Sequence, residues 1–311
     1  MDLKVGNRYR TGLILVFFTA IVSGFSIFVN SYGVKGFDSS VFTFSKNVVV
    51  GVLLFALVVG MGEFKVLKDL KWRQWRQLIF IGLIGGSIPF LLFFKGLQMT
   101  TGTTSAFIHK TLFIYVSIFA LLFLKERLTK GLFVGGVLLL AGNFLLLSPD
   151  FVFGVGHLLI LLATIFWAAE NTLSKYVLRE LSGSVVGFGR MFFGSLFIFL
   201  FLLFSGKAPL IVGMSFSQYV WILVTAGFLL IYVFSYYTGL KEIKVSTAAC
   251  ILTLGSPLTT LLAWVFKGGV VSWFDAVGML LIVLGVVSVV WFGQIVDVVQ
   301  RYFSVKQYEG S

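Results

Sequence analysis

The sequence is poor in charged residues and has a single cysteine. Charged side chains make up 12% of its 311 residues, hydrophobic residues make up 59%, and the mean hydropathy is +1.03. A water-soluble domain carries roughly twice that charged fraction. The composition therefore excludes an ordinary soluble protein and indicates a polytopic membrane protein. The lone Cys250 excludes an internal disulfide.

Signatures of several function classes are also absent. The sequence has no G-x-x-x-x-G-K-[ST] loop, so it gives no indication of an ATP-driven pump, and it has no H-E-x-x-H or G-x-S-x-G motif. Two histidines, one cysteine and one carboxylate deep in an apolar run, Glu170, do not suit an ordinary metal site. We therefore expect no catalytic residue, no cofactor and no bound metal, and a protein that is not an enzyme.

Long apolar runs dominate what remains. A bilayer core of about 30 Å needs about 20 apolar residues per helix, and only helices satisfy every backbone group of such a run in lipid. Ten runs meet this length. They cover residues 12–32, 39–61, 75–96, 103–123, 131–148, 154–177, 184–205, 217–238, 246–267 and 273–293.

The basic residues between the runs predict the orientation. The side that holds both termini carries 17 Lys and Arg, whereas the other side carries only Lys35, Lys207 and Lys267. Since basic loops stay cytoplasmic, we expect a multi-pass protein of the cell membrane with both termini inside. In a soluble protein the net charge of +12 would suggest nucleic acid. Here we expect the lipid bilayer and a small-molecule solute as partners, and no nucleic acid.

The two halves of the chain resemble one another at an offset of 143 or 144 residues. The offset pairs Lys46 with Arg190, Gly62 with Gly206, Gly96 with Gly239, Thr104 with Thr247, Gly135 with Gly278 and Gly142 with Gly285. Five runs per half is an odd number, so the second copy must enter the membrane from the opposite side. The predicted fold is an all-α polytopic membrane protein with ten transmembrane helices. They divide into inverted five-helix repeats at 1–148 and 149–293, before a cytoplasmic C-terminal tail at 294–311.

Two matching modules carry a resemblance to a known family. They read KGLQMTTGTTSAFIHKTLFIYVSIFALLFLKERLTKGLFVGGVLLLAGNFLLL in the first half and GLKEIKVSTAACILTLGSPLTTLLAWVF in the second. Together with the ten runs they resemble the EamA-type branch of the drug/metabolite transporter superfamily. Two positions depart from a strict repeat: Gly268-Gly269 replaces Lys125-Glu126, and Ile114 stands opposite Pro257. The resemblance implies export or exchange of small polar metabolites, such as amino acids, without ATP.

Charged residues inside the runs are costly, at about 2.5–3.5 kcal/mol on insertion scales. Lys46, with Asn47 beside it, and Arg190 occupy equivalent positions of the two halves, which favours a cavity-lining role over snorkelling to the headgroups. Glu170 shares a helical face with Trp167, Asn171 and Ser174. A Glu170–Arg190 pair would serve as a gate or as a static brace, and a proton-carrying Glu170 is a further alternative.

A second group of candidates lies in the first half. His109 and Lys110, about six residues into the fourth run, form with Lys46 a predicted electropositive vestibule that favours an anionic group on the solute. A hydrogen-bonded packing role and a role as proton carrier are the alternatives for His109. Tyr115, Trp167 and Tyr236 are aromatic candidates for the cavity lining, with a structural role as the alternative. Pro89 is expected to kink the third run and to free backbone groups there.

The leading hypothesis is a secondary transporter that works by alternating access, with a coupling proton or a counter-substrate left open. The main alternative is a membrane-embedded enzyme that acts on an anionic lipid or headgroup. A scaffold or receptor is a third class, which the charges inside the runs disfavour.

Overall fold

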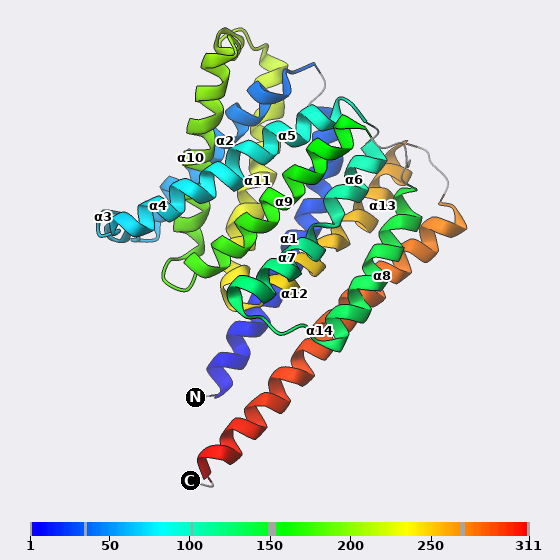
Figure 1. The fold of residues 1–311 in the computed structure, drawn as a ribbon. Coiled ribbons are helices and arrows are strands. Elements are labelled where there is room, and N and C mark those ends of the chain that lie inside the picture. The colour runs from blue at the N-terminus through cyan, green and yellow to red at the C-terminus, as the bar shows by residue number, and fades with distance from the viewer. Residues whose placement is uncertain (1, 34–35, 101, 149–153, 268–270, 310–311) are drawn as a thin grey trace.

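The computed structural model describes residues 2–33, 36–100, 102–148, 154–267 and 271–309. Within them the chain is helical (Figure 1), and ten helices are long and apolar enough to cross a membrane. The prediction of ten spans is therefore confirmed. Lys35 and Gly268-Gly269, which the sequence analysis used, lie outside the described residues.

Seven of the spans are single helices. They are α1 (Asp2–Gly33), α2 (Ser39–Gly60), α8 (Lys130–Leu147), α9 (Val155–Val177), α10 (Gly183–Phe204), α11 (Phe216–Glu242) and α14 (Trp273–Glu309). The short α3 (Phe64–Lys68) follows α2, and a 3₁₀ turn, η3 (Ala208–Ile211), follows α10.

The other three spans are interrupted. The third is α4 (Trp72–Ile81), the π-helical η1 (Gly82–Ser87) and α5 (Ile88–Leu97). The fourth is α6 (Gly102–Lys110), α7 (Leu112–Phe119) and the π-helical η2 (Ala120–Leu124). The ninth is α12 (Val245–Ile251), the 3₁₀ turn η4 (Leu252–Leu254) and α13 (Gly255–Lys267).

Both termini lie at the same end of the bundle, which we call the termini end (Figure 1). Large apolar side chains are exposed on the outward faces of the helices, among them Phe133, Leu223 and Trp291. A surface of this kind requires lipid around it. The protein is therefore a multi-pass membrane protein.

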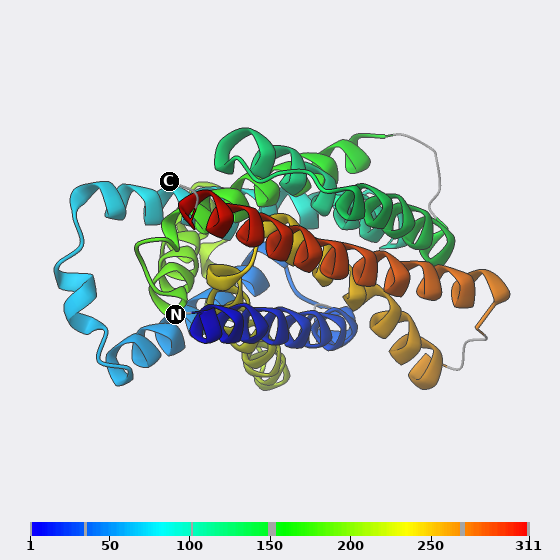
Figure 2. The ribbon, with the colours of Figure 1, turned by 90° about the horizontal axis from the view of Figure 1, so that it is seen from below.

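Glycines set the contact between α8 and α14, which run side by side in both views (Figures 1 and 2). A Cβ on Gly135 would lie 2.6 Å from the carbonyl oxygen of Gly285, and a Cβ on Gly142 would lie 2.7 Å from that of Gly278. Glycine is required here because the two backbones touch. The sequence offset carries Gly135 to Gly278 and Gly142 to Gly285, so it maps each of these two contacts onto the other.

A second pair of glycine contacts obeys the same relation. Gly12 of α1 meets Gly239 of α11, with a Cβ on Gly239 at 2.9 Å from the Gly12 oxygen. Gly96 of α5 meets Gly156 of α9, with a Cβ on Gly96 at 2.7 Å from the Gly156 oxygen. The offset carries Gly12 to Gly156 and Gly96 to Gly239. The division into repeats at 1–148 and 149–293, and the inversion of the second, stay predictions that these paired contacts support.

The helices α2 and α10 are bonded to each other at both ends. Two residues after each helix comes a glycine with positive φ, Gly62 at 74° and Gly206 at 70°, which allows the chain to turn back over the helix end. At the termini end the next residue, Glu63, accepts hydrogen bonds from the hydroxyls of Ser182 and Ser184 at the start of α10.

At the opposite end the equivalent residue, Lys207, donates to Asp38 at 2.7 Å. Asp38 also caps α2 through the N–H groups of Ser40 and Val41. Burial alone would raise the pKa of the Asp38 carboxyl, but Lys207 and the two N–H groups outweigh burial and leave that pKa below its ordinary value. Glu63 thus fixes one end of the α2–α10 pair, and Lys207, its equivalent under the offset, fixes the other end.

We expect Gly142→Ala to destabilise the protein by about 1–3 kcal/mol, because the added methyl group would collide with the Gly278 backbone. Gly136→Ala is the matched control on the same helix, since its methyl group would meet only the Phe113 ring at 3.4 Å. Thermal unfolding of both variants in detergent measures the difference. Equal unfolding temperatures would contradict the glycine contact.

Candidate functional site

The third span is irregular where the candidate site lies. In an α-helix the carbonyl of Gly85 would accept the N–H of residue 89, but Pro89 has none. The chain forms the π-helical turn η1 instead, a feature that often marks functional sites. The predicted disturbance at Pro89 is present.

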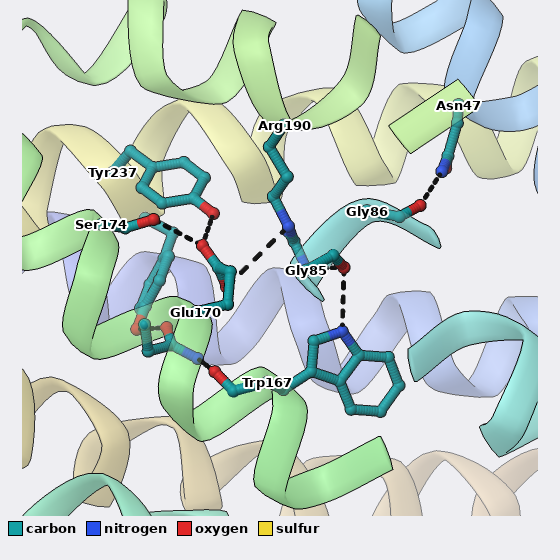
Figure 3. Close-up of polar contacts among 10 residues, drawn as sticks. Asn47, Gly85, Gly86, Trp167, Glu170, Ser174, Arg190 and Tyr237 are labelled. Atoms are coloured by element: carbon teal, nitrogen blue, oxygen red, sulfur yellow. Dashed lines mark hydrogen bonds and ion pairs between the residues drawn. The ribbon is translucent and has the colours of Figure 1, made fainter. Parts of the chain in front are cut away.

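Side chains from the neighbouring spans use the backbone groups of this turn (Figure 3). The Gly85 oxygen accepts from Trp167 Nε1 at 3.1 Å and from Arg190 Nη2 at 3.2 Å. The Gly86 oxygen accepts from Asn47 Nδ2 at 3.1 Å. Four spans, the second, third, sixth and seventh, therefore meet at two consecutive carbonyls.

The absence of side chains at Gly85 and Gly86 makes this meeting possible. A Cβ on Gly85 would overlap the side chain of Glu170, and a Cβ on Gly86 would overlap the Arg190 carbonyl. The same Cβ on Gly86 would lie 2.8 Å from the Cα of Gly194. The turn is packed directly against α9 and α10, so its position fixes theirs.

Glu170 lies at the centre of the cluster and is 1% exposed. Its Oε1 accepts from Ser174 Oγ and from Tyr237 Oη, both at 2.5 Å. Its Oε2 lies 3.9 Å from Nε of Arg190, a nitrogen that has no hydrogen-bond partner among the described residues. The structure thus brings Glu170 and Arg190 together as an ion pair at the limit of contact (Figure 3).

A buried ion pair of this kind is sensitive to the loss of one partner. Removing one member leaves an uncompensated charge, which typically costs about 3–5 kcal/mol. The remaining polar atoms of α9 and α11 continue the network. Tyr236 donates to Asn171 Oδ1, and Asn171 Nδ2 donates to the Trp167 oxygen at 2.7 Å.

Aromatic rings cover one side of this cluster. The Trp167 ring lies 5.3 Å from that of Phe90, 5.5 Å from that of Phe93 and 5.0 Å from that of His109. The Arg190 guanidinium lies over the Phe90 ring at 5.9 Å. His109 therefore joins the site through Trp167, in an edge-to-face contact.

The other predicted residues lie apart from this cluster. Lys46 is buried, with Nζ 3.4 Å from Asn30 Oδ1 and 4.9 Å from the centre of the Phe42 ring. Lys110 is half-buried, and among the described residues its ammonium group has no hydrogen-bond or ion-pair partner. Tyr115 is half-buried against the apolar core. The vestibule of Lys46, His109 and Lys110 stays a prediction.

Sequence reasoning missed three members of the cluster: Tyr237 and the carbonyls of Gly85 and Gly86. Tyr237 is the neighbour of the predicted Tyr236, and both bind α9, so the sequence signal lay in the pair. The carbonyls themselves give no signal in the sequence. Pro89, four residues after Gly85, does indicate that the Gly85 carbonyl lacks its α-helical donor.

A cavity of about 470 Å³ opens at the termini end, between the ends of α1, α2, α10 and α11. None of the nine predicted residues lines it. Within the described residues no group of three or more His, Cys, Asp or Glu could hold a metal ion.

The comparisons with known proteins agree with one another and point to one family. The family model of the EamA-like transporter family matches residues 10–148 and 154–291. An uncharacterized transporter of Methanothermobacter thermautotrophicus is 23% identical, over 72% of this chain and 67% of its own length. An uncharacterized transporter of Archaeoglobus fulgidus is 24% identical, over 61% of this chain and 66% of its own length.

The chain thus spans about two thirds of the length of each of these relatives. A protein of known crystal structure is similar in fold, with a TM-score of 0.75 at 20% identity, over 91% of this chain and 98% of its own.

Tyr237→Phe should lower the free energy of unfolding by about 1–2 kcal/mol, because the buried Glu170 carboxylate loses a hydroxyl donor. Tyr232→Phe is the matched control, since Tyr232 lies on the same helix and stacks on Tyr236 without a hydrogen bond to Glu170. Thermal unfolding in detergent compares the two. The network would be unimportant for stability if the two variants unfolded alike.

Proposed function

The chain belongs to the EamA-like transporter family, and on this basis we propose that it is a secondary transporter. It moves a small polar metabolite, an amino acid or another organic anion or zwitterion, across the membrane by export or exchange. The family is one of transporters, which points to a protein that is not an enzyme.

One observation carries the proposal: a buried polar network joins the two proposed halves of the chain. Asn47, Gly85 and Gly86 belong to the first half, and Trp167, Glu170 and Arg190 belong to the second. Buried polar groups within membrane spans are costly and commonly mark a solute pathway. In a transporter with two repeats, the solute site is expected at the interface between them.

We assign Glu170 and Arg190 to a gate or brace within this network. Both oxygens of Glu170 face polar partners, two hydroxyls and one guanidinium. These contacts support a fixed role more than proton carriage. Coupling to a proton or a counter-substrate would then use a group outside this pair.

Lys46, His109 and Lys110 are proposed to receive the anionic group of the solute. Lys110 supports this role best, because the residue is half-buried and its ammonium group lacks a partner among the described residues. An anionic solute would supply that partner. The two repeats would rock around the site, so that it opens to each side in turn.

Purified protein in proteoliposomes should take up a labelled solute from a panel of amino acids, organic acids and sugar phosphates. Lys110→Met should weaken that solute's affinity about tenfold to hundredfold, since one charge-assisted contact contributes about 1.5–3 kcal/mol. The matched control is Lys65→Met, at an exposed lysine of the termini end.

A wrong transporter assignment and a wrong vestibule assignment give different results in this experiment. If no member of the panel moves, the transporter assignment is wrong, and chemical alteration of the vesicle's anionic lipids would then favour the membrane-embedded enzyme. If flux is present but Lys110→Met and Lys65→Met behave alike, the vestibule assignment alone is wrong.

The termini end is proposed to face the cytoplasm. A cysteine introduced by Lys68→Cys, in a Cys250→Ala background, should therefore escape an impermeant thiol reagent added to intact cells. Gly213→Cys, in the loop at the opposite end where a Cβ meets no atom within 4 Å, should react. The reverse labelling pattern would invert the topology.

A further inference from the structure

The cavity at the termini end is lined by side chains of both charges. Its volume of about 470 Å³ lies in the range of small-molecule sites. The charged and hydroxyl groups around it come from different segments of the chain: Arg8, Glu63, Ser182, Ser184, Lys241 and Glu242.

Glu63 is held in place on one wall. Its Oε2 accepts from both Ser182 and Ser184, and Ser182 in turn caps the first turn of α10 through the Val185 N–H. Within the described part of the chain, Oε1 of Glu63 accepts no hydrogen bond. One carboxylate oxygen therefore remains to receive a donor from a ligand.

The cations Arg8 and Lys241 also line the cavity. Lys241 Nζ donates to the Leu181 oxygen at 3.0 Å, which fixes the ammonium group and leaves it further protons to donate. Arg8 is exposed, and the described residues give it no ion pair. A carboxylate would find two positive donors here.

The three charges other than Glu63 have no counterpart in the other half. The offset that relates the two halves carries Arg8 to Val152, Lys241 to Gln98 and Glu242 to Met99, whereas it carries Glu63 to the charged Lys207. Only one half therefore carries charges at the positions of Arg8, Lys241 and Glu242, which points to a role specific to that end.

We infer that this cavity binds the solute before it reaches the candidate site, and that the solute is a zwitterion of the amino-acid type. Its ammonium group binds Glu63, and its carboxylate binds Arg8 and Lys241. This inference rests on the proposed transport function. A simple anion would face Glu63 and Glu242, and a simple cation would face Arg8 and Lys241, so a ligand with both charges fits best.

The cavity is also next to the buried network. Thr238 lines it, and the adjoining Tyr237 binds Glu170. Ser184 precedes Arg190 by six residues on α10, a rise of about 9 Å. The wall of the cavity at Ser184 is therefore less than two helical turns along α10 from Arg190 of the candidate site.

Equilibrium binding to the purified protein in detergent tests this inference. The probes are amino acids, each compared with the acid that lacks its amino group and the amine that lacks its carboxyl group. At least one amino acid should bind about tenfold more tightly than both of its analogues.

Two variants then locate the site. Arg8→Gln should weaken binding of the amino acid and of its acid analogue about tenfold, with little change for the amine. Arg10→Gln is the matched control, an exposed arginine of the same helix outside the cavity lining. Glu63→Gln should weaken binding of the amino acid and the amine instead. Its amide oxygen can still accept from both serines, and an unchanged unfolding temperature would show that the fold survives.

The inference is overturned if Arg8→Gln and Arg10→Gln bind the amino acid alike, or if the acid analogues bind as tightly as the amino acids. Flux of organic acids through proteoliposomes, with no binding of amino acids, would overturn the zwitterion site and leave the transport function standing. Absence of flux for every solute would overturn the transport function itself.

Discussion

The centre of this bundle depends on a backbone carbonyl that lacks its α-helical hydrogen-bond donor. Pro89 leaves the Gly85 oxygen without its helical donor, and lipid offers no substitute. Trp167 and Arg190 supply the missing hydrogen bonds from two other spans. Because Arg190 is oriented by this carbonyl, its Nε faces Glu170, and the ion pair follows from the backbone irregularity.

Glycine contacts place the remaining helices around that centre. In lipid no hydrophobic effect drives one helix against another, so close backbone approach and hydrogen bonding must do so. The contacts of Gly135 with Gly285 and of Gly12 with Gly239 are of this kind. They lie along helices that surround the network, and they leave the spans' apolar faces to the lipid.

The sequence predicts much of this arrangement, because length and hydropathy determine the spans. The family, the ten helices and the proximity of Glu170 to Arg190 all follow from side chains of unusual type or spacing. The contact of His109 with Trp167 does not, because it depends on how α6 is rotated against α9. The two carbonyl acceptors and Tyr237 were missed for a similar reason: hydrogen-bond partners across helices depend on rotation and depth, which periodicity alone leaves undetermined.

The two ends of the α2–α10 pair respond differently to the surrounding medium. Lys207 and Asp38 form an ion pair whose side chains are 39% and 24% exposed, so dissolved salt screens their attraction. At the termini end Glu63 is bound by neutral hydroxyls, whose hydrogen bonds depend less on screening. Ionic strength in the compartment at the opposite end therefore loosens one end of the pair and leaves the other tight. The two faces of the molecule thus differ in their sensitivity to the electrolyte that each one meets.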